Sequence, residues 1–458
     1  MTPPADASRR EFLKAGAALG GGLVLGVALP GRGATSPAAS MPNAWVRIGS
    51  DDSVTILCAR SEMGQGVYTA LPTLVAEELE VDLDRIKVEI APAGPPYVNA
   101  LLGGQITGGS TSVVESYDKL RLAGAQARSM LVAAAAQKWG VLPSACRAER
   151  GAVLGPGGAR VTYGAVAEAA SKLPVPDNPP LKEHRASRYV GKAVNRLDSA
   201  GKIDGSAEFG IDVRLPGLLY AALAQCPVIG GKVRSFDAAR AKTMPGVKHV
   251  VQVTDGVAVV ADSWWRARVA RDAVSIQWDE GAGRGLSTDG IKAALKAAAA
   301  KPGAVIRKTG DVGAALAGAA KTVEAEYELP FLAHATMEPM NFTADVRKDS
   351  CLVCGPTQFQ QLAAGVAAQV SGLPPEKVTV RTTFLGGGFG RRIDVDFIAQ
   401  AVEISKAIGG GPVKLLWTRE DDMTHDFYRP TSYHQLQAAL DAQGRPVALK
   451  YHMTSPSV

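Results

Sequence analysis

The sequence has few of the features that mark disulfide-bonded, cluster-binding or membrane-spanning proteins. Its 458 residues contain five cysteines at wide spacings, which form neither a disulfide framework nor the four-ligand set of an iron–sulfur cluster. Cys351 and Cys354 form one C-x-x-C pair without a second pair at zinc spacing, so we interpret them as strand residues or a lone redox pair. Beyond the N-terminal segment there is no run of 18 uncharged apolar residues. The net charge of +6 is scattered without a dense basic run, which gives no support for nucleic-acid binding.

The common nucleotide-binding and nucleophile motifs are also missing. A dinucleotide fingerprint beginning at Gly386 would need glycine at position 391, where this chain has Arg391. No Gly-Lys pair is followed by Ser or Thr, which excludes a P-loop. The segment around Ser110 lacks the last glycine of a G-x-S-x-G nucleophile elbow.

What the sequence does contain is three glycine-rich segments, each followed by a predicted helix. They are Gly64-Gln65-Gly66, Gly108-Gly109-Ser110-Thr111-Ser112 and Gly386-Gly387-Gly388-Phe389-Gly390-Arg391. Glycine can adopt positive φ and expose its N–H, and a following helix N-terminus favours anions, so these segments predict binding of an anionic ligand. Ordinary helix-starting turns remain an open alternative for the first two. The Ser110-Thr111-Ser112 hydroxyls are expected to cap the helix that follows them.

The N-terminus predicts export. Arg9 and Arg10 precede a weakly hydrophobic run at 15–29, which is typical of a twin-arginine signal. Small residues at 33–34 and 38–39 offer cleavage points, and retention as a membrane anchor is the alternative. This route carries proteins that fold and take up cofactors before crossing the membrane. We therefore expect a periplasmic location, with association with the membrane as the open alternative.

Helical and strand periodicities alternate along the chain, which predicts an α+β or α/β, multi-domain protein. Expected helices lie near 68–80, 113–139, 287–300, 313–320 and 395–408, and expected strands near 86–90, 249–253, 257–261, 274–278 and 378–384, with a hairpin at 44–60. A proline-rich linker runs from 173 to 181. The predicted units are 1–40, 41–180, 185–320 and 321–458.

Several motifs together resemble the large subunit of molybdenum hydroxylases, the xanthine dehydrogenase/aldehyde oxidase family. The motifs are Glu62-Met63-Gly64-Gln65-Gly66-Val67-Tyr68-Thr69, the 107–112 turn, Val190-Gly191-Lys192 with 201–219, His334-Ala335-Thr336-Met337-Glu338-Pro339, Gly355-Pro356-Thr357-Gln358 and the 384–392 loop. In most of the family the G-Q-G loop follows the triple-glycine loop. Its early position here resembles the isoquinoline 1-oxidoreductase beta subunit and aldehyde dehydrogenase branch.

The resemblance implies a fold, a cofactor and partners. The fold is an α/β hammerhead domain, at 185–320, between two molybdopterin-binding segments. The cofactor is molybdopterin cytosine dinucleotide with molybdenum, and the partner is a small subunit with two [2Fe-2S] clusters, often followed by a cytochrome c. Gln358 matches the glutamine that hydrogen-bonds a molybdenum oxygen. Gln65, the 108–112 turn and the 386–391 loop match cofactor-binding positions, with no protein side chain as a metal ligand.

Two departures from the family pattern bear on activity and substrate. The family's catalytic base is a glutamate in a C-terminal G-x-G-E motif, which residues 1–458 lack, so we interpret the chain as truncated and inactive alone. Glu338 is interpreted as structural. Ile393 stands where purine-oxidising relatives carry glutamate, which favours aldehydes or N-heteroaromatic rings. Alternatives are a periplasmic binding protein, a dinucleotide-dependent dehydrogenase and a non-catalytic fragment.

Overall fold

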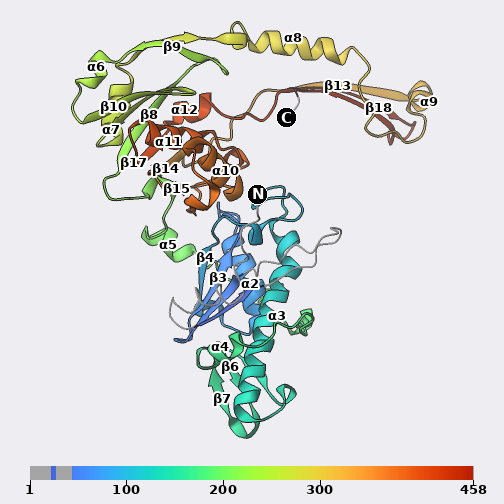
Figure 1. Cartoon of the computed structure of the whole chain (residues 1–458). Coiled ribbons are helices and arrows are strands. Elements are labelled where there is room, and N and C mark those ends of the chain that lie inside the picture. The colour runs from blue at the N-terminus through green and yellow to red at the C-terminus, as the bar shows by residue number, and fades with distance from the viewer. Residues whose placement is uncertain (1–21, 27–43, 457–458) are drawn as a thin grey trace, which may run out of the picture.

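The computed structural model describes residues 22–26 and 44–456, which form two bodies and an extended arm (Figure 1). The first body is built on a four-stranded sheet of order β1-β2-β3-β4. Its elements are β1 (Gly22–Gly26), β2 (Ala44–Gly49), β3 (Val54–Cys58), α2 (Val67–Leu79), β4 (Ile86–Ile90), α3 (Ser112–Trp139), β5 (Arg147–Glu149), β6 (Ala152–Leu154), β7 (Arg160–Thr162) and α4 (Tyr163–Ser171). Apolar side chains of the sheet, α2, α3 and α4 form one core.

The predicted hairpin, helices and strand of this body are confirmed. β2 and β3 pair antiparallel with Ile48 opposite Val54, and β3 pairs in parallel with β4. Gly22–Gly26, within the apolar run of the predicted export signal, pairs antiparallel with β2 as β1. Arg9, Arg10 and the two predicted cleavage points lie outside the described residues.

The second body is a seven-stranded sheet of order β10-β11-β8-β17-β14-β15-β16. Its elements are α5 (Ser199–Asp204), β8 (Leu219–Gln225), β9 (Lys232–Asp237), α6 (Ala239–Lys242), β10 (Val247–Val253), β11 (Gly256–Ala261), α7 (Trp264–Arg271), β12 (Ser275–Asp279), β14 (Asn341–Val346), β15 (Cys351–Gly355), α10 (Gln360–Ser371), β16 (Val378–Thr382), α11 (Asp396–Ala407), β17 (Gly411–Leu416) and α12 (Arg419–Thr424). β8 pairs in parallel with β17, so one sheet spans the predicted boundary at 320. Cys351 and Cys354 lie buried in β15, which confirms their interpretation as strand residues.

The arm is a three-stranded antiparallel sheet of order β13-β18-β19, which extends from the second body (Figure 1). Its elements are α8 (Thr288–Ala299), α9 (Val312–Ala317), β13 (Lys321–Leu329), β18 (Ser432–Leu440) and β19 (Pro446–Thr454). α8 packs against the sheet, where Lys296 Nζ lies 2.6 Å from Glu328 Oε1. Within the described residues, no helix combines the length and apolar character needed to cross a membrane.

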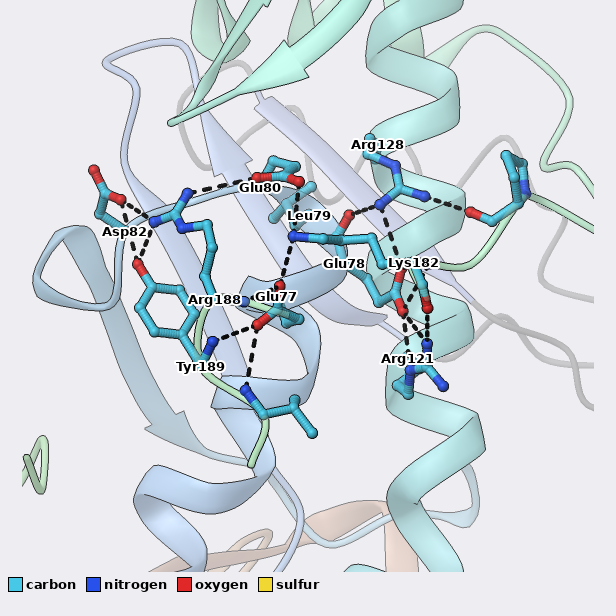
Figure 2. A network of polar contacts seen from close by, with 12 residues as sticks. Glu77, Glu78, Leu79, Glu80, Asp82, Arg121, Arg128, Lys182, Arg188 and Tyr189 are labelled. Atoms are coloured by element: carbon cyan, nitrogen blue, oxygen red, sulfur yellow. Dashed lines mark hydrogen bonds and ion pairs between the residues drawn. The ribbon is translucent and has the colours of Figure 1, made fainter. Parts of the chain in front are cut away.

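The chain that follows the predicted linker is held by buried carboxylates at the end of α2 (Figure 2). Glu77 accepts hydrogen bonds from Lys182 Nζ at 2.5 Å and from the backbone N–H of Tyr189 at 2.7 Å. Glu78, fully buried, accepts from Arg121 Nε at 2.9 Å and from the backbone N–H of Lys182 at 3.0 Å. A buried carboxylate is stable only when cations and N–H groups satisfy it, so this network fixes the chain between the two bodies.

Candidate functional site

The three glycine-rich segments meet around Gln358, which lies just before α10 and is 2% exposed. Its Nε2 donates a hydrogen bond to the carbonyl of Thr107 at 2.8 Å, and its Oε1 accepts one from the N–H of Gly390 at 3.2 Å. The side chain therefore fastens the second glycine segment to the third. Because an amide nitrogen carries two hydrogens and the described residues accept only one of them, the other N–H of Gln358 remains for a ligand.

The first glycine segment joins the same centre. The backbone N–H of Ser61 donates to Thr107 Oγ1 at 2.8 Å, and Ser61 Oγ donates to the carbonyl of Thr357 at 2.7 Å. Gly388 closes the junction, because a β-carbon there would lie 2.4 Å from Gln358 Oε1 and 2.8 Å from the sulfur of Met63. Segments distant in the sequence are thus packed at a spacing that only glycine permits.

The N-terminus of α2 is filled by the protein itself, which corrects the expectation that this helix would bind an anion. Glu62 is fully buried, and its carboxylate accepts hydrogen bonds from the backbone N–H groups of Gly64 at 2.8 Å, Gly66 at 3.2 Å and Tyr68 at 2.9 Å. A carboxylate at this position satisfies the free N–H groups and the positive end of the helix dipole. An acidic residue just before the G-Q-G loop is the sequence signal that could have identified this cap.

Gln65 lies within this loop and shapes it. Its Oε1 accepts from the N–H of Met63 at 2.8 Å and its Nε2 donates to the carbonyl of Ser61 at 2.8 Å, which leaves one amide N–H free. Gly64 and Gly66 have φ of 109° and 94°, and a β-carbon on either would meet nothing within 4 Å. The loop therefore presents bare backbone to open space, which suits close approach of a flat ligand.

Unlike the N-terminus of α2, which Glu62 caps, the N-terminus of α3 has no side-chain cap. Thr111 is the N-cap residue but makes no side-chain cap, because its hydroxyl donates to the carbonyl of Gly108 at 2.9 Å and accepts from Asn99 Nδ2 at 2.7 Å. The expectation of a hydroxyl cap is therefore wrong. Gly109 and Ser110 both adopt left-handed conformations, with φ of 60° and 55°. A long helix with an uncapped N-terminus favours an anion such as a diphosphate.

The triple-glycine loop is supported from beneath by Glu338. The Glu338 carboxylate accepts hydrogen bonds from the N–H of Gly386 at 2.8 Å and from the N–H of Ile211 at 3.0 Å, and it pairs with Arg392 at 3.3 Å. Its interpretation as structural is confirmed. At the tip of the loop, Phe389 has φ of 56° and remains 72% exposed, so its ring faces outward.

Arg391 lies in the protein interior, contrary to the prediction that it binds cofactor. Its guanidinium, 1% exposed, pairs with Asp396 at 2.8 Å and with Asp426 at 2.8 Å. Burial opposes its charge, but these carboxylates hold the pKa of Arg391 above its usual value. Burial lowers the pKa of Arg392 to about 10. Both arginines therefore brace the loop through acidic residues, Arg391 through Asp396 and Asp426 and Arg392 through Glu338.

Ile393 packs beneath the second glycine segment. A β-carbon on Gly108 would lie 3.3 Å from Ile393 Cδ1, so this apolar side chain lies against the turn that precedes α3. A separate cavity of about 760 Å³ lies between α7 and α12 and is lined by Trp264, Trp265 and Trp417. None of the three glycine segments lines that cavity.

The site thus defines a class of protein: one that holds a large anionic cofactor between glycine loops from two bodies. Two molybdopterin cofactor-binding domain models match the chain, at residues 5–212 and 298–457. Isoquinoline 1-oxidoreductase subunit beta from Brevundimonas diminuta is 32% identical over 92% of this chain and 60% of its own length. Membrane-bound aldehyde dehydrogenase [pyrroloquinoline-quinone] from Gluconacetobacter polyoxogenes is 32% identical over 98% of this chain and 60% of its length.

Molybdopterin cofactor-binding domains therefore account for most of the chain, which is similar to the large subunits of the xanthine dehydrogenase family and spans about 60% of the length of these two relatives. Aldehyde oxidoreductase from Desulfovibrio gigas aligns with a TM-score of 0.47 at 21% identity, over 64% of this chain and 38% of that one. The observed mixture of helices and sheets in several bodies confirms the predicted α+β class. The residues present fit a molybdopterin: bare backbone at Gly64 and Gly66, an uncapped α3 and a free N–H on Gln358.

Proposed function

We propose that this chain is the cofactor-binding part of an exported molybdenum hydroxylase that oxidises an aldehyde or an N-heteroaromatic compound. The observation that carries the proposal is the convergence of three glycine segments on Gln358, which builds a cofactor site from both molybdopterin-binding regions. The related proteins include an isoquinoline 1-oxidoreductase subunit, an aldehyde dehydrogenase and a nicotinate dehydrogenase subunit, which supports this substrate class.

The proposed cofactor is molybdopterin cytosine dinucleotide. The backbone N–H groups at the start of α3 and the hydroxyls of Ser110 and Ser112 would hold its diphosphate. The loop at Gly64–Gly66 would lie against the pterin, and the remaining N–H of Gln358 would face the reacting centre. The bound group supplies two-electron oxidation with water as the oxygen source, while these residues bind, orient and exclude bulk water.

The substrate is proposed to be apolar around its reacting carbon. Phe389 is exposed at the loop tip, and Ile393 packs under Gly108. Neither side chain provides the carboxylate that a purine would need. The catalytic base is not assigned to any residue of this chain, and Glu338 is unsuitable because the protein interior already uses its carboxylate oxygens.

The proposal extends to location and electron transfer. The Arg9-Arg10 signal supports periplasmic export by the twin-arginine route, with membrane association as an alternative fate of the signal. Electrons would leave through a small subunit with [2Fe-2S] clusters and then a cytochrome c.

The test is to purify the native complex and measure three released groups: molybdenum, cytosine nucleotide and pyrroloquinoline quinone. The third is included because one relative carries it in its name. Near-stoichiometric molybdenum and cytosine nucleotide, with water-dependent oxidation of an aldehyde or isoquinoline, is the expected result. Folded protein without molybdenum would overturn the proposal and would favour a periplasmic binding protein instead.

A further inference from the structure

A histidine and an aspartate that the proposed function does not use lie beside the triple-glycine loop. Asp426, whose side chain is 1% exposed, accepts a hydrogen bond from the backbone N–H of His334 at 2.5 Å. Its carboxylate oxygens also lie 3.0 and 2.9 Å from His334 Nδ1. Three contacts from one carboxylate fix both the backbone and the ring of this histidine.

The orientation of the ring leaves its other nitrogen available. With Nδ1–H donated to Asp426, Nε2 of the neutral ring accepts hydrogen bonds, and Nε2 of the protonated ring donates them. Among the described residues, Nε2 of His334 has no hydrogen-bond partner, and the side chain is 20% exposed. A histidine that served only to pack would more commonly have both ring nitrogens satisfied.

The free nitrogen lies next to the reacting part of the site. A β-carbon on Gly390 would lie 3.6 Å from His334 Nε2, and the N–H of that same glycine donates to Gln358 Oε1. His334 and Gln358 therefore flank Gly390 from two directions. The carboxylate of Asp426 also pairs with Arg391, which follows Gly390, so the loop and the imidazole are held by one group.

The local backbone and surroundings are consistent with a ligand-facing role. Ala335 adopts φ of 48°, a conformation that residues with a β-carbon avoid unless the fold requires it. Around this turn the apolar side chains of Met337, Phe389 and Phe427 are 88%, 72% and 53% exposed. An apolar rim with one fixed imidazole suits a small apolar molecule that carries a single polar atom.

We propose that His334 is a further substrate-binding residue, which orients the aldehyde oxygen or ring nitrogen through Nε2, and that Asp426 is its positioning residue. This inference rests on the proposed function. It requires no proton transfer and no redox step by the histidine. Its role is to hold the polar atom of the substrate so that the neighbouring carbon faces the centre beside Gln358.

The first test uses the cofactor-loaded complex with His334→Ala, His334→Gln and Asp426→Asn, and His184→Gln as an exposed control. Losing one hydrogen bond to substrate should raise KM about tenfold in His334→Ala. Molybdenum content should stay unchanged, and His334→Gln should restore part of the affinity because its amide can also donate or accept. Wild-type KM and kcat in His334→Ala would overturn the proposal. Thermal unfolding of each variant separates a folding defect from loss of binding.

A second readout does not depend on turnover. Diethylpyrocarbonate reacts with unprotonated, accessible imidazole nitrogens, and its product at each histidine can be followed by mass spectrometry. Saturating isoquinoline or an aliphatic aldehyde should slow modification of His334 at least about fivefold and leave His184 unaffected, as expected for occupancy of the site. Equal rates with and without either probe would overturn the inference. A complex without molybdenum would refute the proposed function. Protection of His334 by isoquinoline or the aldehyde is measured separately, so it would still show whether this residue binds substrate.

Discussion

Glu62 Oε1 lies 2.8 Å from Arg196 Nη2, and this pair joins the G-Q-G loop to the segment that enters the second body. Arg196 also donates to the carbonyl of Gly64 at 2.7 Å and pairs with Asp198. The carboxylate that caps α2 is therefore itself held by a cation from the next part of the chain. Loop geometry and the attachment of the second body are coupled through one buried side chain.

Replacing Glu62 with glutamine should reveal this coupling. Glu62→Gln keeps the size of the side chain but removes its charge, so the α2 N–H groups and Arg196 lose their anionic partner. We expect a loss of about 1–3 kcal/mol in the free energy of unfolding, measured by urea denaturation. The loss stays in this range because Arg196 is partly exposed and water screens its pair with Glu62. Glu89→Gln, whose pair with Arg47 is exposed, should cost less than about 1 kcal/mol. Equal losses in the two variants would contradict the buried cap.

The junction at Gly388 predicts a paired alanine experiment. Gly388→Ala would place a β-carbon 2.4 Å from Gln358 Oε1, so the amide must move and release its hold on the loops. We expect a destabilisation of about 1–3 kcal/mol and a reduced molybdenum content of the purified complex. Gly365→Ala, within α10 and with nothing within 4 Å of the added carbon, should stabilise by up to about 1 kcal/mol. Unchanged molybdenum content in Gly388→Ala would argue against the role of Gln358.

The buried network of Figure 2 predicts sensitivity to acid. Although burial raises it, hydrogen bonds from Lys182, Tyr189 and Arg188 hold the pKa of Glu77 below its usual value of 4.5. A depressed carboxylate pKa stabilises the fold above pH 4.5 and loses this effect as pH falls through the folded value. Unfolding free energies between pH 6 and 3 should therefore fall more steeply in the wild type than in Glu77→Gln. An exposed control, Glu376→Gln, should keep the wild-type slope.

Thiol reactivity should separate the cysteines. Burial raises the pKa of Cys58 to about 12 and those of Cys351 and Cys354 to about 11. Because the thiolate is the reactive form, iodoacetamide at pH 8 should leave these three unmodified in the native protein and label the partly exposed Cys146. Peptide mass spectrometry measures both outcomes. Rapid labelling of Cys351 and Cys354 would revive their interpretation as a redox pair.

Local signals in the sequence predicted the elements well. The α2 and α3 helices, the β2–β3 hairpin and the strands at 86–90 and 378–382 follow hydrophobic periodicity and turn residues, which depend on neighbours in the chain. The pairing of β8 with β17 could not be predicted, since periodicity carries no information about distant partners. For the same reason, the sequence placed the glycine segments near a ligand but gave no sign of the buried pairing of Arg391 with Asp426.

The site residues also divide into those that the sequence identified and those whose roles depend on distant partners. Gln358 was identified through the family resemblance and the glycine loops already through their own sequence pattern, and the structure brings them together. Glu62 and His334 acquired roles only when their partners became visible, because the contacts of His334 reach across nearly a hundred residues of sequence. Wherever a role depends on a carboxylate from another segment, the sequence offers the residue but not the pair.

The parallel pairing of β8 with β17 also sets the order in which the protein can form. During synthesis β8 and its antiparallel neighbour β11 emerge well before β17 (Gly411–Leu416), so one edge of β8 stays unpaired until β17 is made. Pairing between strands so far apart in the sequence slows folding, and an unpaired strand edge promotes aggregation. The region at 185–320 is therefore a poor choice for isolated expression, and nascent chains should need chaperone protection until β17 closes the sheet.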